Sequence, residues 1–249
     1  MLPNPLKSIA LILATLLAPS QGWALTLDDV VKNVESNYKN IVAFKGRFNQ
    51  TATLKTLNKV QKGQGKIFYK KPNKIKWQYM KPAEQEIISD GKTLWMYLPE
   101  NRQVYIYELA DDKGAANQGQ IPGNFLTSLG DMRRDFSVRW GTPKDRDAQG
   151  NYIIELVPKE PVANLRNIFL IVRQDITAVS SSTFPVLAST VYDSYGNMTN
   201  IEFINIEVLE TADETVAAKK KGGTLPDSIF TYLPPADVEI VKPPLMMPK

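Results

Sequence analysis

The feature that most constrains the fold is a long series of short segments in which apolar and polar residues alternate. The series runs from Phe44 to Leu109, and only a few turn residues separate one segment from the next. Such alternation indicates β-strands, because successive side chains of a strand point to opposite faces of a sheet. Connections this short leave no room for the helical crossovers that parallel strands need. The sequence therefore predicts an antiparallel meander.

Turn signals divide this series into strands. The stretch 60–65 contains two glycines and interrupts the alternation, and Asp90-Gly91 is among the strongest short hairpin signals. A two-residue loop at Asp90-Gly91 would pair Ile87 with Leu94 and Gln85 with Met96, which continues one apolar face into the next hairpin. Strands are expected at 44–54, 66–70, 74–79, 85–89, 93–97, 103–109, 136–140, 152–157, 168–173, 187–193 and 200–209, with a last extended piece at 238–241.

One amphipathic helix precedes the strands. Thr26 can cap its start, and Asp28 and Asp29 lie where the helix dipole favours negative charge. Apolar residues then recur at helical spacing for about four turns and form one stripe. A shorter helical segment is expected at 125–129. The stripe of the first helix consists of Leu27, Val30, Val31, Val34, Tyr38 and Ile41.

The first 24 residues have the pattern of a cleavable secretory signal peptide. Lys7 is followed by an apolar run at 9–18, and the small residues Gly22 and Ala24 suit cleavage before Leu25. The run is shorter than the roughly 20 residues that span a bilayer, although an uncleaved anchor remains the alternative. Cleavage would leave residues 25–249 as one exported β domain.

Composition removes several classes of chemistry. The chain contains no cysteine and no histidine, so thiolate catalysis, Ser-His-Asp triads and histidine-based zinc sites are excluded, and we expect no metal and no cofactor. Paired carboxylates remain formally open, but Asp90 and Asp193 lie in predicted turns, where turn geometry already explains an acid. The formal net charge of +4 is too small to indicate a polyanion partner. We expect no catalytic residue.

The stretch 63–82, GQGKIFYKKPNKIKWQYMKP, mixes lysines with aromatic residues. Strand parity places most of the lysines on one face, which we expect to be solvated, and the apolar residues on the other. A nucleic-acid reader of the stacking kind needs both on one surface, so no nucleic-acid partner is expected. The apolar face is either plain core or the wall of a ligand cavity. It carries Ile67, Tyr69, Ile75, Trp77 and Tyr79, whereas Lys66, Lys70, Lys74 and Lys76 have the opposite parity.

A series of short motifs follows in order along nearly the whole chain after residue 24. They are Phe48-x-Gln50, Gly63-x-Gly65, Lys71-Pro72-Asn73 with Trp77 and Pro82, Ser89-Asp-Gly-Lys-Thr-Leu-Trp-x-Tyr-x-Pro99, Phe125-Leu126, Asp135-Phe136 and Phe230-Thr-Tyr-Leu-Pro-Pro235. This order resembles that of the LolA-type outer-membrane lipoprotein carrier proteins of Gram-negative bacteria.

The resemblance implies a mainly β fold, a half-open antiparallel barrel of about eleven strands with a short helical lid over a hydrophobic cavity. It also implies a monomeric periplasmic carrier without enzymatic activity. Such a carrier accepts triacylated lipoproteins from an inner-membrane ABC transporter and delivers them to an outer-membrane lipoprotein receptor. A periplasmic sensor of lipids or lipoproteins with the same half-barrel fold is the alternative.

The resemblance also assigns a site. Lys71 stands where the family typically has an arginine that hydrogen-bonds the lid backbone. Lysine lacks the planar fork of arginine, so we expect Lys71 to be a latch that holds the lid more loosely. Val30, Val34 and Tyr38 would belong to the lid helix. The lipid-binding cavity is expected to be lined by Ile67, Tyr69, Ile75, Trp77, Tyr79, Ile87, Leu94, Met96, Phe125, Leu126 and Leu129.

Two further expectations concern the surface. Added length at Ser180–Leu187 and around Lys219–Gly223 reads as surface loops. Trp95 and Tyr97 lie on the face opposite the expected cavity, and we expect a terminal segment to cover them.

Overall fold

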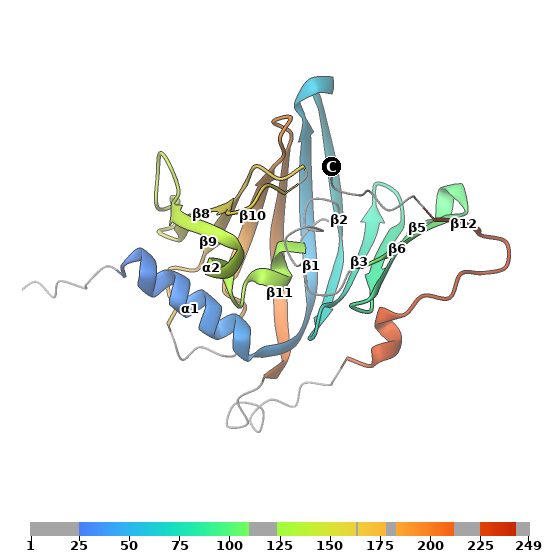
Figure 1. The fold of residues 1–249 in the computed structure, drawn as a ribbon, viewed down its shortest axis with the longest axis horizontal. Coiled ribbons are helices and arrows are strands. Elements are labelled where there is room, and N and C mark those ends of the chain that lie inside the picture. Colours follow the sequence, from blue (N-terminus) through green and yellow to red (C-terminus); the bar gives the residue numbers. More distant parts are fainter. Residues whose placement is uncertain (1–24, 110–123, 163, 178–182, 212–224, 243–249) are drawn as a thin grey trace, which may run out of the picture.

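The computed structural model describes residues 25–109, 124–162, 164–177, 183–211 and 225–242 (Figure 1). The expected signal peptide and the loop around Lys219–Gly223 lie outside the described residues, so both remain predictions.

The described strands form one open sheet. Its order is β12-β6-β5-β4-β3-β2-β1-β11-β10-β9-β8-β7, so two meanders of consecutive strands meet where β1 pairs with β11. The strands β7 and β12 end the order and do not pair with each other, which confirms the mainly β, half-open fold. The strands are β1 (Ile41–Leu54), β2 (Lys59–Lys70), β3 (Lys74–Lys81), β4 (Gln85–Ser89), β5 (Thr93–Leu98), β6 (Gln103–Glu108), β7 (Phe136–Trp140), β8 (Tyr152–Pro158), β9 (Asn167–Val172), β10 (Val186–Tyr192), β11 (Met198–Thr211) and β12 (Glu239–Val241).

The strands β1 to β11 pair with one another in antiparallel fashion. The short strand β12 runs parallel to β6, which the sequence did not predict. β12 can run parallel to β6 because a long connection, and not a hairpin, leads to β12.

The helix α1 (Leu27–Asn40) confirms the predicted amphipathic helix. Thr26 Oγ1 accepts a hydrogen bond from the Asp29 amide at 3.2 Å, and the Asp29 carboxylate accepts one from the Thr26 amide at 3.0 Å. This capping box fixes the start of the helix, and β1 begins directly after its end. Figure 1 shows α1 and the short helix α2 (Met132–Asp135) on the same side of the sheet. The other helical turns are η1 (Lys55–Leu57), η2 (Pro99–Asn101), η3 (Asn124–Ser128) and η4 (Asp227–Phe230).

The expected interruption at 60–65 is wrong, because β2 begins at Lys59 and includes both glycines. The turn falls earlier, at η1 and at Asn58, whose φ is +46°. Gly65 is needed where strands crowd an aromatic ring: a Cβ there would lie 2.0 Å from the Gln78 carbonyl oxygen and 2.9 Å from Phe48 Cε1. The glycine thus serves close packing within a strand and not a turn.

The predicted register of the hairpin at Asp90-Gly91 is wrong by two residues. Ile87 pairs with Met96, and Ser89 pairs with Leu94. The loop is longer than two residues because Asp90 Oδ1 accepts hydrogen bonds from the amides of Lys92 and Thr93 at 2.8 and 2.7 Å, which makes an Asx-type turn. A shift of two residues preserves the face on which each side chain lies.

The prediction of a solvated lysine face is wrong for three of its four lysines. Lys70 and Lys74 donate to the two carboxylate oxygens of Asp227 at 3.0 and 2.7 Å, and Lys76 donates to Glu86 at 3.0 Å. Only Lys66 is exposed. The C-terminal segment with η4 covers this face, and it buries a small second cluster of Ala43, Leu209, Leu225 and Phe230.

The same C-terminal segment packs on Tyr97, which confirms the expectation that a terminal segment covers this residue. The rings of Tyr97 and Tyr232 lie 5.3 Å apart, so a terminal segment packs on this part of the outer face. Trp95 is partly buried.

The expectation of a surface loop at Ser180–Leu187 is wrong for the residues of it that the structure describes. Phe184 and Val186 are 4% and 1% exposed and belong to the main core. The aromatic ring of Phe184 fills space between α1 and the sheet, and strand β10 starts two residues later. Residues 178–182 lie outside the described residues.

A buried carboxylate ties three strands of the second meander together. Glu155 on β8 accepts hydrogen bonds from Arg139 Nε on β7 at 2.8 Å and from Asn167 Nδ2 on β9 at 2.5 Å. The Arg139 guanidinium, followed by Asn167, lowers the pKa of Glu155 below its ordinary value of 4.5, although burial opposes the shift.

We expect Glu155→Gln to lower the free energy of unfolding at neutral pH by about 2 kcal/mol. A carboxylate with a lowered pKa in the folded protein stabilises it above the unfolded pKa, and this contribution is lost as pH falls through the folded pKa. Thermal unfolding measured from neutral pH down past 4.5 should therefore show a smaller acid loss in the variant than in the parent. Glu84→Gln, at an exposed position, is the control, and equal acid loss in all three proteins would contradict the role of Glu155.

Candidate functional site

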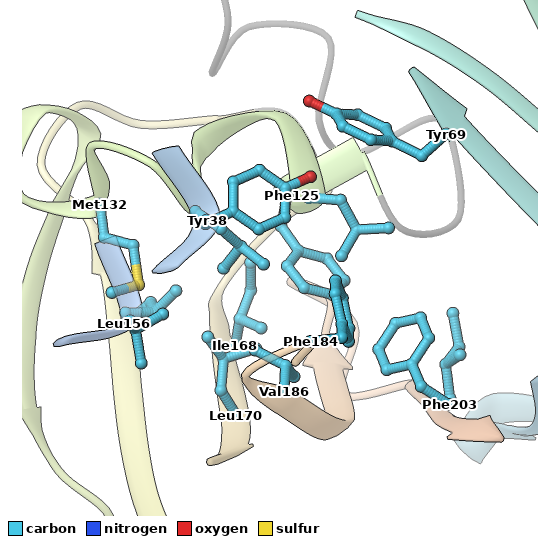
Figure 2. Packing of buried hydrophobic residues seen from close by; sticks show 14 of the residues in the cluster. Tyr38, Tyr69, Phe125, Met132, Leu156, Ile168, Leu170, Phe184, Val186 and Phe203 are labelled. Atoms are coloured by element: carbon cyan, nitrogen blue, oxygen red, sulfur yellow. The ribbon is translucent and has the colours of Figure 1, made fainter. Parts of the chain in front are cut away.

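The inner face of the sheet, the face that carries Ile67 and Trp77, lies under α1. Val30 and Val34 are fully buried and Tyr38 is 1% exposed. They join one continuous cluster with residues of the sheet and of η3 (Figure 2). The predicted wall residues Ile67, Tyr69, Ile75, Trp77, Tyr79, Ile87, Leu94, Phe125, Leu126 and Leu129 are all buried members of this cluster, and Met96 is partly buried against it.

Aromatic side chains connect α1 to the middle of the sheet. The centre of the Phe184 ring lies 6.3 Å from that of Tyr38 and 5.4 Å from that of Phe203. Figure 2 shows Phe184 between these two residues. Phe203 in turn lies 6.5 Å from Trp77, and Tyr38 lies 5.7 Å from Tyr69. The side chains of α1 and of the sheet therefore pack directly against one another and share one core.

The predicted site left out six aromatic members of the cluster, namely Phe44, Phe48, Phe136, Tyr152, Phe184 and Phe203. Phe44, Phe48 and Phe203 alternate correctly within strands β1 and β11, so strand parity could have identified them. Phe48 packs edge-to-face on Trp77 at 4.6 Å. Phe184 precedes its strand, and no local pattern marks it as buried.

Lys71 connects the sheet to the end of α1. Its Nζ donates hydrogen bonds to the carbonyl oxygens of Tyr38 at 2.9 Å and Lys39 at 2.7 Å, which belong to the last turn of the helix. The ammonium also lies 5.7 Å from the centre of the Tyr38 ring. A cation is favoured at this end of a helix because the dipole is negative there. Burial lowers the pKa of the Lys71 ammonium, and partial desolvation strengthens the hydrogen bonds that it donates.

The remaining polar contacts of α1 are few and come from side chains. Asn37 Nδ2 donates to the Thr177 carbonyl oxygen at 2.7 Å, and Asn33 Nδ2 donates to that of Ile176 at 3.4 Å. Asp28, at the other end of the helix, forms an ion pair with Arg133, and the Arg133 amide donates to Glu35 Oε1 at 3.3 Å. These contacts and the apolar stripe are the interactions that would have to break if α1 moved away from the sheet.

Two buried donors of this cluster are unsatisfied. Among the described residues, the Tyr38 hydroxyl and the Trp77 indole N–H have no hydrogen-bond partner. Burial, with a further effect of the neighbouring Tyr69, raises the pKa of Tyr38 well above its ordinary value. An unsatisfied buried polar group costs about 1–3 kcal/mol, so these two groups lower the stability of the folded protein.

We expect Tyr38→Phe to raise the free energy of unfolding of the empty protein by about 1 kcal/mol, because it removes an unpaired hydroxyl and keeps the ring. Tyr79→Phe should do the opposite, since the Tyr79 hydroxyl donates to Gln50 Oε1 at 2.8 Å. Thermal unfolding of the two variants and the parent measures both signs. A loss of stability in Tyr38→Phe as large as in Tyr79→Phe would show that the Tyr38 hydroxyl is satisfied.

None of the helices in the described parts of the chain has the length and apolar character needed to cross a lipid bilayer. The open sheet, with a helix across its buried apolar face, defines a half-open β-barrel with a helix-covered interior. The chain belongs to the LolA family: the family model described as outer membrane lipoprotein carrier protein LolA matches residues 39–216.

Curated relatives agree over nearly the full length. The outer-membrane lipoprotein carrier protein of Chromobacterium violaceum is 28% identical over 95% of this chain and 96% of its own. That of Methylobacillus flagellatus is 23% identical over 94% of this chain and 97% of its own. Among solved structures, a LolA superfamily protein from Nitrosomonas europaea superposes with a TM-score of 0.43 and 13% identity, covering 84% of this chain and 99% of its own.

Proposed function

We propose that this protein carries the acyl chains of lipoproteins from the inner membrane through the periplasm to a receptor on the outer membrane. The observation that supports this most directly is the shared cluster in which the inner face of the sheet and the apolar stripe of α1 bury each other. An acyl chain that replaced α1 on the inner face would meet the same apolar surface. In this proposal, α1 is the lid and Lys71 is its latch.

The energetics of acyl chains explain why a carrier needs such a lid. Each methylene exposed to water costs about 0.8 kcal/mol, so a chain of about 16 carbons would gain roughly 12 kcal/mol on full burial. A permanently open apolar wall would retain its cargo too long for delivery. When the cargo leaves, the apolar stripe of α1 covers the wall again. This burial offsets part of the free energy that release of the acyl chain costs. The helix therefore lowers the net affinity to a level that permits transfer.

The route in this proposal is the one that membership of the family implies. An inner-membrane ABC transporter would supply the acylated lipoproteins, and an outer-membrane receptor would accept them. The carrier itself would act as a monomer, after removal of residues 1–24, by non-covalent binding alone.

Native mass spectrometry of the protein purified from the periplasm tests this function. We expect acylated protein to co-purify with the carrier. We also expect the carrier not to bind the same cargo once its acyl chains have been removed. A protein that is empty and that also fails to take lipoprotein from inner-membrane preparations would exclude the carrier. An empty protein that instead binds a membrane-anchored signalling protein in a lipid-dependent manner would favour the sensor.

A further inference from the structure

The hairpin of β1 and β2 extends beyond β3 and β4. Strands β1 and β2 have 14 and 12 residues, whereas β3 has 8 and β4 has 5, and the hairpin tip stands at the top of the view in Figure 1. Residues 55–62 at this tip are all exposed. Leu57 and Val60 are 69% and 57% exposed. Exposed apolar side chains that gather at one place on the surface can mark an interaction site.

A second turn reaches the same place. The Lys55 amide donates to Asn197 Oδ1 at 2.9 Å, so the turn between β10 and β11 touches the tip of the β1–β2 hairpin. Tyr195 in this turn is 70% exposed. The turn itself is rigid, because the Asp193 carboxylate accepts hydrogen bonds from the amides of Tyr195 and Asn197. We call Leu57, Val60 and Tyr195, with Lys55, Lys59 and Lys62, the tip patch.

The charge around the tip patch is strongly one-sided. Between Ser36 and Ala83 the sequence has twelve lysines and arginines and no aspartate or glutamate. Away from the tip, Lys45 on β1 forms an ion pair with Glu207, and Lys76 on β3 forms one with Glu86. Within the described residues, no ion pair involves Lys55, Lys59 or Lys62. The adjoining turn contains one acid, Asp193, and its carboxylate accepts hydrogen bonds from the amides of Tyr195 and Asn197.

We propose that the tip patch docks onto the surface of a bilayer that contains anionic phospholipids. Exposed aliphatic side chains can enter the boundary between headgroups and acyl chains, a tyrosine suits the interface, and lysines bind the phosphates. The shape favours a fluid surface over a protein partner, because the patch is a narrow projection and not a groove. Docking would bring the carrier to a membrane without opening the lid, so the inference does not depend on the proposed function.

Flotation of the full chain without residues 1–24 with two kinds of vesicle tests the proposal. One kind is pure phosphatidylcholine and the other is phosphatidylcholine mixed with phosphatidylglycerol. We expect binding to the mixed vesicles only, with loss at high salt because the lysine contribution is screened. Replacing Lys59 and Lys62 together by glutamine should weaken binding by roughly 30-fold. Leu57→Asp should weaken it by roughly tenfold or more.

Leu233→Asp provides the matched control, because Leu233 is a 90% exposed leucine in the C-terminal segment, outside the tip patch. It should bind mixed vesicles as the parent does. All the substituted residues are exposed, so unchanged thermal unfolding will show that the variants fold. Absence of parent binding to mixed vesicles, or equal losses in Leu57→Asp and Leu233→Asp, would overturn the proposal. Either result leaves lipoprotein carriage, which native mass spectrometry measures separately, untouched.

Discussion

Replacing Lys71 by leucine is expected to tighten the binding of an acylated probe and to loosen α1 in the empty protein. The substitution removes the donor of both hydrogen bonds to the last turn of the helix. Hydrogen bonds from charged donors contribute about 1.5–3 kcal/mol, so the open fraction should rise roughly 10- to 100-fold. If acyl chains enter only the open state, the apparent affinity rises by the same factor while the closed state still predominates.

Two measurements check this expectation. Hydrogen exchange should show faster exchange of the α1 amides, and titration with a fluorescent acyl probe should show a lower Kd. Lys71→Arg should shift both quantities in the opposite direction, because the guanidinium fork can hold the two carbonyl oxygens more rigidly. Lys66→Leu, at an exposed lysine of the strand that precedes Lys71, is the neutral control. Unchanged exchange and unchanged Kd in Lys71→Leu would show that Lys71 is only a surface residue.

The inner face of the sheet was predictable because strand parity is a local property. Once residues 66–79 were assigned to strands, the positions of Ile67, Tyr69, Ile75 and Trp77 relative to each other followed without knowledge of the fold. The same reasoning survived an error in the hairpin register, since the error of two residues kept Ile87 and Leu94 on their face.

The errors concern contacts between residues far apart in the sequence. Lys70 and Lys74 have the pattern of a solvated face, and only the folded chain brings Asp227 to them. Phe184 follows a run of serines and a threonine, and it is buried because α1, more than a hundred residues earlier, lies over it. The pairing of β1 with β11, which joins the two meanders, likewise has no local signal. Local periodicity cannot identify partners of this kind.

A covalent link between α1 and the segment that follows β9 is expected to abolish uptake of acylated cargo. Asn37 Nδ2 lies 2.7 Å from the Thr177 carbonyl oxygen, so these positions are close enough for a short covalent link between α1 and the segment that follows β9. The chain has no cysteine, and Asn37→Cys with Thr177→Cys would therefore introduce the only two thiols. A disulfide, or a short bifunctional maleimide if the disulfide geometry is unfavourable, would hold α1 in place.

Each single variant and the reduced double variant serve as controls, because they carry the same substitutions without the link. The loss of the Asn37 hydrogen bonds is common to the reduced and the linked protein, so it cancels in the comparison. Thermal unfolding should show that the linked protein is folded and more stable than the reduced one, as expected for a covalent link that restricts the unfolded chain.

The most direct measurement of the central claim, that the lid helix and the acyl chains compete for one apolar surface, is acyl-probe binding to this double variant before and after reduction. The linked protein should fail to bind the probe, and reduction, or absence of the maleimide, should restore binding to the level of the single variants. Equal binding by the linked and the reduced protein would show that acyl chains do not replace α1, and it would contradict the account.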